Sequence, residues 1–357
     1  MDELISGLNK RVSPCDQAAA EKARARWNSI AKPLGSLGFL EDAIVKIAGL
    51  TGNDKITLAN KTVLVFCADN GVVEEGVTQT GSEITALMAE NIAKGRSSVC
   101  KMAEAAGANV IAVDVGMKEK PASEGIVNLR AAAGTANIAK GPAMTKEQCE
   151  RAVLAGVEMA ARCKKDGVNL IACGEMGIGN TTTSAALASV FLSIPPDKAA
   201  GRGAGLSDAG LTKKIGAIER AIAINDPDPK DAFEALRRLG GFDIAAMAGA
   251  CIGGAVYRIP VVLDGFISAV AAMIAVRMCP TCEIALLASH VSAEPAAGLV
   301  LNALGLKPLI AANMRLGEGT GAVCAFPLLD MANAVYSNMA TFGEIGMENY
   351  TPQGNGI

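Results

Sequence analysis

Hydrophobic and polar residues follow a helical pattern in the first sixty residues of the chain. The alanine-rich segment 16–30 places its charges on one predicted face, and segment 39–52 repeats a helical period before it ends at a glycine. Between them lies "KPLGSLG", residues 32–38, whose proline and glycines predict a turn. We therefore expect two helices joined by a turn in this region.

After residue 60 the pattern changes to short, β-rich runs that are apolar almost without interruption. Strands without polar alternation are buried on both faces, as in a parallel sheet, and the long segments between the runs supply the crossovers that parallel strands need. The pattern predicts an open, doubly wound α/β sheet with an added helical domain. The six runs are Thr62–Ala68, Asn109–Val113, Asn169–Cys173, Ile259–Leu263, Ile284–Ala288 and Leu309–Asn313.

Acids, small polar residues and glycines follow each of these runs. In open α/β sheets, ligands bind at the carboxyl ends of the strands, so we expect these residues to share one site. They are Asp69 and Asn70, then Asp114, then Glu175 and Asn180, then Asp264, then Ser289, His290, Ser292 and Glu294, and finally Arg315 and Glu318.

Two glycine-rich segments add to this predicted site. In "GEMGIGNTTTSAA", residues 174–186, glycines allow a ligand to approach the backbone, and "NTTT" can cap the helix that follows. Amides at such a helix start bind phosphate, although neither a P-loop nor a clean GxGxxG is present. The second segment, "GRGAGLSDAGLTKK", ends at Lys213 and Lys214, which either meet a phosphate or cover a solvated helix face.

Glu318 is the candidate general base. It lies between Gly317 and Gly319, after the last apolar run, where it is either a turn residue or a carboxylate directed into the site. Neighbouring apolar residues would raise its pKa toward a useful range.

Composition narrows the class of partner. Of 357 residues half are hydrophobic, only 3% are aromatic, and the net charge is −3, which argues against nucleic acid or anionic membranes as partners. The first ten residues carry acids and no apolar core, unlike a signal peptide. The most apolar segment, 265–276, is too short to span a bilayer. We expect a soluble, cytoplasmic protein.

Cysteine and histidine usage gives little sign of a metal site. The ten cysteines are scattered through apolar runs, as reduced, buried thiols are. Cys279 and Cys282 have the spacing of a redox or metal pair, but no second pair completes a zinc set. His290 is the only histidine, and we interpret it as a hydrogen-bonded structural residue.

Several longer strings together resemble one enzyme family. "KPLGSLG", "ADNGVVEEGVT", "GEMGIGNTTTSAA", "GRGAGLSDAGL", "VVLDGFISAVAA", "SHVSAEPA" and "MRLGEGTGA" are similar to those of nicotinate-nucleotide:dimethylbenzimidazole phosphoribosyltransferases, over about residues 32–344. The resemblance implies a Rossmann-like parallel sheet of about six strands with flanking helices, plus a small helical domain from both termini. The expected divisions are a first part of the small domain at 1–58, a catalytic domain at 59–330, and a C-terminal helix at 331–357 that returns to the small domain.

The same resemblance implies the reaction and its residues. The family moves the phosphoribosyl group of nicotinate mononucleotide onto the lower-ligand base of a cobamide, with inversion to the α-riboside and release of nicotinate. Glu318 would take the acceptor's proton, and no metal or cofactor is needed. The residues expected to bind nicotinate mononucleotide are Glu175, Gly177, Ile178, Gly179, Asn180, Thr181, Lys214, Asp264 and Ser292.

Three positions depart from the family pattern. Asn70 stands where the family usually has histidine, Met88 where a glutamine commonly lines the lower-base pocket, and Thr80 near a usual serine. Methionine offers only soft apolar contact, whereas glutamine can hydrogen-bond an azole nitrogen. This favours a phenol such as p-cresol as an alternative acceptor to dimethylbenzimidazole, since one branch of the family pairs two paralogous subunits and attaches phenols.

Other assignments stay open at this point. The chain is expected to act as a homodimer or as a heterodimer with a paralogue. An alternative hypothesis is that the chain is a non-catalytic partner subunit that binds the nucleotide, but the presence of Glu318 argues against this. An NAD-dependent oxidoreductase would need an acid about twenty residues after a GxGxxG, which is not found.

Overall fold

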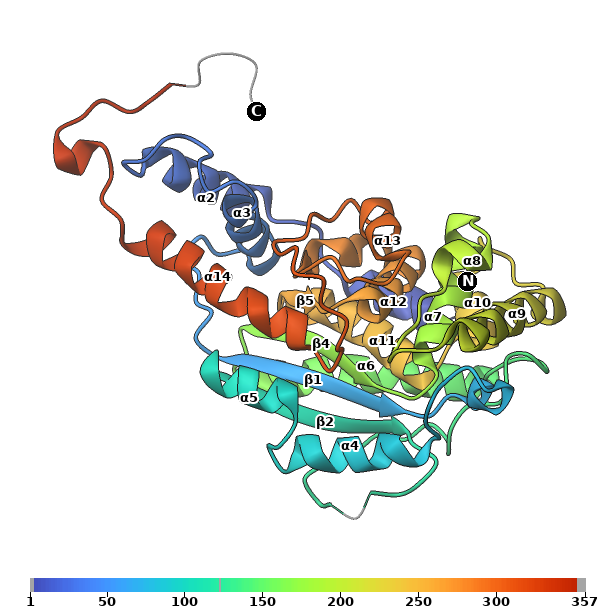
Figure 1. The fold of residues 1–357 in the computed structure, drawn as a ribbon. Coiled ribbons are helices and arrows are strands. Elements are labelled where there is room, and N and C mark those ends of the chain that lie inside the picture. The colour runs from blue at the N-terminus through green and yellow to red at the C-terminus, as the bar shows by residue number, and fades with distance from the viewer. Residues whose placement is uncertain (1–2, 122, 352–357) are drawn as a thin grey trace.

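A six-stranded parallel sheet forms the centre of the computed structural model, which describes residues 3–121 and 123–351 (Figure 1). The strand order is β3-β2-β1-β4-β5-β6, so the order reverses direction between β1 and β4, as in doubly wound folds that bind ligands at this point. The strands are β1 (Lys61–Ala68), β2 (Ala108–Gly116), β3 (Val127–Asn128), β4 (Leu170–Met176), β5 (Val261–Leu263) and β6 (Leu286–Ala288).

Five of the six predicted strands are confirmed, and the sixth prediction was wrong. Leu309–Asn313 makes only an isolated bridge between Ile310 and His290. Pro308 before this run has no N–H to donate, residues 311–313 are exposed, and Asn313 has a left-handed φ of 52°, which ends the extended conformation. The sixth strand is instead β3, a two-residue strand beside β2 that is too short to show a hydrophobic period.

Helices cover both faces of the sheet because alternate residues of β1 point into two separate cores. Leu64 and Phe66 lie in one core, while Val63 and Val65 lie in the other. On the first face lie α1 (Glu3–Arg11), α6 (Lys146–Lys165), α7 (Asn180–Leu192), α8 (Pro196–Ala199), α9 (Asp208–Asn225), α10 (Ala232–Leu239), α11 (Phe242–Tyr257), α12 (Phe266–Met278) and α13 (Ala297–Ala303). On the second lie α2 (Gln17–Ser29), α3 (Phe39–Thr51), α4 (Glu83–Ala93), α5 (Ser98–Ala105) and α14 (Thr320–Asn338).

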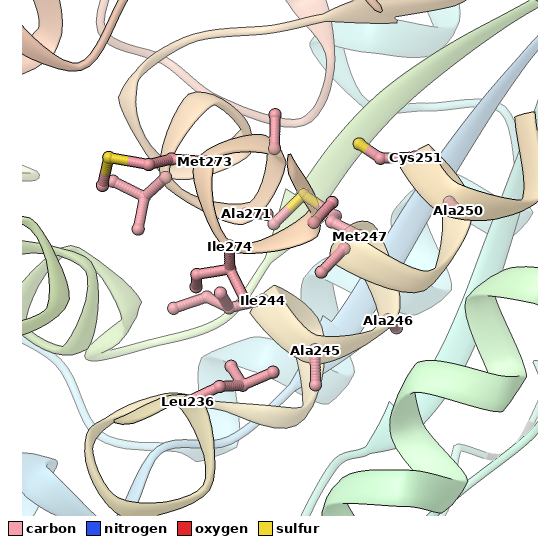
Figure 2. Close-up of a cluster of buried hydrophobic side chains, with 14 of the residues drawn as sticks. Leu236, Ile244, Ala245, Ala246, Met247, Ala250, Cys251, Ala271, Met273 and Ile274 are labelled. Atoms are coloured by element: carbon pink, nitrogen blue, oxygen red, sulfur yellow. The ribbon is translucent and has the colours of Figure 1, made fainter. Parts of the chain in front are cut away.

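Small residues bring the helices of the first face close together. A methyl group on Gly156 of α6 would lie 2.5 Å from the Ala250 nitrogen of α11, so the two helices touch through their backbones. Figure 2 shows the neighbouring cluster, where Ile244 of α11 lies beside Ile274 of α12, with Leu236 of α10 nearby. This packing fixes the start of α11, which lies behind the site described below.

The N-terminal helices α2 and α3 pack against the C-terminal half of α14, at the upper left of Figure 1. The Trp27 and Tyr336 rings are 5.2 Å apart, and Arg26 Nε donates to the Tyr336 carbonyl at 3.0 Å. The predicted helices near the N-terminus and their connecting turn are confirmed. The domain divisions at 58/59 and 330/331 stay a prediction, and residues 1–2 and 352–357 of the outer segments lie outside the described residues.

Candidate functional site

A cavity of about 370 Å³ opens at the carboxyl ends of β4, β5 and β6. Its wall comes from the segments that follow these strands, from the segment between β1 and α4, and from the loop before α14. Every residue that the family resemblance assigns to catalysis, donor binding or the lower-base pocket lines this cavity. The lining residues are Val77–Thr80, Met88, Glu175–Thr181, Arg202–Ala204, Leu206, Lys214, Asp264–Ser268, His290, Ser292, Glu294, Arg315–Glu318 and Thr320.

The expectation that every run delivers its polar residues to one site was too broad. The ends of β1 and β2 carry structural acids instead. Asp114 accepts from the amides of Gly116 and Met117 and from Arg130 Nε at 2.9–3.0 Å, while Asp69 accepts from the Lys118 amide at 2.7 Å. Turn chemistry explains Asp114, whereas Asp69 joins the end of β1 to the segment after β2, and neither acid lines the cavity.

Glu318 is held in a tight left-handed turn. The φ angles are 89° at Gly317, 58° at Glu318 and 91° at Gly319. This left-handed conformation is strained at Glu318, because its side chain crowds the backbone there as a glycine would not. The turn lies directly on β4, because a methyl group on Gly174 would come within 2.6 Å of the Glu318 carbonyl carbon. Glycine at 174 is what lets the loop approach the strand.

The Glu318 carboxylate is directed inward and anchored. It is only 7% exposed, and its Oε2 accepts from the amide of Val99 at the start of α5 at 3.3 Å. Burial raises the pKa of Glu318, hydrogen bonds from Val99 and Ser97 lower it, and the Asp264 charge raises it further. The net effect is a carboxyl with a raised pKa, which is a stronger base than an exposed glutamate.

Asp264 holds the same loop from the other side. Its Oδ2 accepts from the Gly319 amide at 3.1 Å, and its Oδ1 accepts from the amides of Gly321 and Ala322 at 2.6 and 3.3 Å. The carboxylate thus caps the first turn of α14. Burial raises the pKa of Asp264, while His290 and these three amides lower it. Asp264 therefore positions the loop that carries Glu318.

The glycine-rich segment forms a turn between β4 and α7. A methyl group on Gly177 would lie 2.7 Å from the Ala68 carbonyl oxygen, so only glycine fits, and the Ile178 amide donates to Thr85 Oγ1 at 3.3 Å. The prediction that "NTTT" caps α7 was wrong. Gly179, at φ 96°, is the capping residue and no side chain caps the helix, because Asn180 is already helical.

Lys214 is fully buried behind this turn. Its Nζ donates to Thr181 Oγ1 and to the Gly201 carbonyl, each at 2.9 Å, which joins the two glycine-rich segments that the sequence singled out. Burial lowers the pKa of Lys214 to about 8, and the Glu294 charge raises it in part. An anion in the cavity would favour the charged form of this lysine.

Thr80 and Met88 also line the cavity, as do Val77 and Met176. Met88 is half-buried on α4 and Thr80 is exposed. The Met88 sulfur is 4.0 Å from Asn91 Nδ2, which makes it a weak acceptor at most.

Sequence reasoning missed Arg202 and Gln79 as cavity residues. Arg202 pairs with Asp208, and Gln79 donates to the Gly205 carbonyl, so both stabilise the second glycine-rich segment at the cavity mouth. An arginine inside "GRGAG" is a signal that could have been used.

The remaining candidates from the sequence have structural surroundings. His290 lines the cavity, and its Nδ1 lies 3.1 Å from Ser289 Oγ, which agrees with the hydrogen-bonded role expected of it. Cys279 and Cys282 are buried elsewhere, and no cluster able to hold a metal ion occurs within residues 3–121 and 123–351. No helix in these ranges is both long and apolar enough to cross a membrane.

Comparisons with known proteins agree with this geometry. A family model described as "Phosphoribosyltransferase" matches residues 12–347. The chain is 44% identical over 332 residues to the nicotinate-nucleotide–dimethylbenzimidazole phosphoribosyltransferase of Ruminiclostridium cellulolyticum, which covers 93% of this chain and 94% of that protein. It is 40% identical to the protein of that name from Escherichia coli strain K12, over 99% and 98% of the two chains. The crystal structure of CobT from Thermus thermophilus matches with a TM-score of 0.88 at 41% identity, covering 93% of this chain and all of that one.

Proposed function

Since the chain belongs to the nicotinate-nucleotide–dimethylbenzimidazole phosphoribosyltransferase family of pentosyltransferases, we propose that its cavity transfers the 5-phosphoribosyl group of nicotinate mononucleotide to a cobamide lower-ligand base. The observation that carries the proposal is Glu318, a residue of the cavity lining whose carboxyl is buried and anchored at the start of α5. The family match and the named relatives lend no support to an oxidoreductase.

The proposed step is a single displacement at C1′ of the ribose. The acceptor atom bonds to C1′ while the bond from C1′ to the pyridinium nitrogen breaks, and its electron pair stays on that ring nitrogen, which is neutral in the released nicotinate anion. The acceptor's proton passes to Glu318, whose raised pKa suits a general base. Attack opposite the leaving group inverts the centre, so a β-riboside donor gives an α-riboside.

The donor phosphate would lie against the turn from Gly177 to Thr181. This turn lines the cavity at the start of α7, where the helix dipole favours an anion. Lys214, which already contacts Thr181, would supply a positive charge. Ser292, 9% exposed at the cavity wall, is proposed to meet the donor's nicotinate carboxylate.

Replacing Lys214 by methionine is expected to raise KM for nicotinate mononucleotide about tenfold to a hundredfold, because a charge-assisted contact is lost. Steady-state kinetics with varied donor measures this. The matched control is Lys213→Met, on the same helix but outside the cavity wall. An unchanged KM in Lys214→Met would contradict the phosphate assignment.

We propose that phenols are accepted as well as azole bases, because Met88 lines the cavity, donates no hydrogen bond and accepts one only weakly. A phenol would need only an apolar surface and one carboxylate to take its proton. The partner is proposed to be a second copy or a paralogue. Leu316 is 55% exposed although it lines the cavity, as expected of a wall that another chain covers.

Acceptor choice is measured by incubating the protein with nicotinate mononucleotide and either p-cresol or dimethylbenzimidazole, with and without any paralogue. We expect ribosides of both acceptors. Met88→Gln is expected to favour dimethylbenzimidazole over p-cresol about fivefold, the value of one hydrogen bond. No phenolic riboside under either condition would remove the phenol proposal, and no riboside of any acceptor would favour a non-catalytic partner subunit.

A further inference from the structure

Two buried carboxyl groups lie one behind the other at the glycine-rich turn. Glu175, near the end of β4, is 8% exposed and lines the cavity, while Asp243, in the first turn of α11, is fully buried and does not. Asn180 joins them, because its Nδ2 donates both to Glu175 Oε2 and, at 2.9 Å, to Asp243 Oδ2. These two acids are called the carboxyl pair below.

The carboxyl pair lacks a cation. Within the described ranges neither Glu175 nor Asp243 forms an ion pair with lysine or arginine. The groups that act on Glu175 are Asn180 and the acids Asp243, Asp264 and Glu318.

Among the described residues, no lysine or arginine hydrogen-bonds or pairs with Asp243 either. It receives hydrogen bonds from Asn180 and from the Ile244 amide at 3.0 Å, and the start of the α11 dipole favours its negative form. Asn70 lies beside it, since a methyl group on Gly241 would meet both side chains. Burial raises the pKa of the Cys67 thiol on β1, and the charges of Glu175 and Asp243 raise it further, so this thiol stays neutral.

Two such acids joined through one neutral amide cannot both be ionised without a large penalty. Burial raises the pKa of Glu175 to about 8, with Asn180 lowering it and Asp243 raising it. Burial raises the pKa of Asp243 to about 6, against hydrogen bonds that lower it. Both shifts act in the same direction: they favour one shared proton on the pair near neutral pH, and they favour it on Glu175, the group with the higher pKa.

We propose that Asp243, joined to Glu175 through Asn180, is a positioning residue that adds to burial in holding Glu175 in its protonated form at neutral pH, so that Glu175 meets the donor as a neutral, hydrogen-donating acid. The benefit to the enzyme rests on the proposed function, in which the donor brings a phosphate and a carboxylate into a cavity whose wall already carries the acids Asp264, Glu294 and Glu318 beside the basic residues Arg202, Lys214 and Arg315. A neutral Glu175 adds no repulsion there and can donate to a phosphate oxygen or a ribose hydroxyl.

The test uses ligand-free protein, so its result does not depend on whether transfer occurs. Infrared difference spectra of wild type against Glu175→Gln are recorded across pH 5–10. The carbonyl stretch of a protonated carboxylic acid is expected at pH 7 in wild type and not in Glu175→Gln. In Asp243→Asn the like charge is gone, so the band should disappear at a pH about one unit lower.

A second variant tests the same link if Asp243→Asn does not fold. Asn70→His places a titratable cation beside Asp243 and should also shift the disappearance of the band to lower pH. Asp114→Asn, a buried acid that makes no contact with Asn180, is the control and should leave the midpoint unchanged. No protonated band at pH 7, or the same midpoint in wild type and in the folded Asp243 or Asn70 variant, would overturn the proposal.

Discussion

Replacing Glu318 by glutamine is expected to lower kcat for phosphoribosyl transfer by about 10²–10⁴-fold, while nicotinate mononucleotide still binds. The amide keeps the shape and can still accept from Val99, but it cannot take the acceptor's proton. The acidic limb of the pH–rate profile, which in wild type follows protonation of Glu318 as pH falls through its raised pKa, should disappear. Steady-state kinetics and calorimetric binding of the donor measure these effects.

The matched control is Glu104→Gln, an exposed glutamate on α5, the helix whose first turn anchors Glu318. It should behave as wild type. Normal turnover in Glu318→Gln would show that another group, or solvent, takes the proton, and the proposed mechanism would then be wrong.

Replacing Asp264 by alanine is expected to reduce both stability and kcat. Three amides at the start of α14 lose their shared acceptor, which should cost roughly 2–4 kcal/mol of unfolding free energy. The loop that holds Glu318 in its left-handed turn would then relax, and a displacement of about 1 Å at a catalytic group can cost about 100-fold in rate. Denaturant unfolding and steady-state kinetics give the two values.

Asp264→Asn separates positioning from donor binding. Asparagine can still accept at Oδ1 from Gly321 and Ala322, but its NH₂ would face the Gly319 amide. We therefore expect a smaller loss of stability with kcat still reduced. A rise in KM for the donor with unchanged stability and kcat would support the predicted donor contact instead and contradict the positioning role.

Much of the fold could be predicted because buried parallel strands have a strong sequence pattern. β1 and β4 each contain a continuous apolar run, and both strands were predicted from it. Leu309–Asn313 is also apolar, but only Leu309 and Ile310 pack against the core while residues 311–313 are exposed, which no local pattern reveals. β3 has two residues, and its pairing depends on tertiary contact with β2.

The candidate site could be predicted because strand ends and glycine-rich turns gather in one place in this fold class. The sequence could not predict which acids line the cavity and which accept hydrogen bonds from backbone amides. Asp114 and Glu175 both follow apolar runs, yet only Glu175 lines the cavity. Asp243 lies inside a helical segment without any motif, and only the structure shows that Asn180 connects it to Glu175.

The central claim is that this cavity transfers a phosphoribosyl group with inversion and that Glu318 takes the acceptor's proton. The most direct measurement follows wild type with nicotinate mononucleotide and dimethylbenzimidazole by NMR, which reports nicotinate release and the anomeric configuration of the product together. We predict one nicotinate released for each α-riboside formed, with no release when the acceptor is left out. Release that does not depend on an acceptor, or a β-riboside product, would contradict the account.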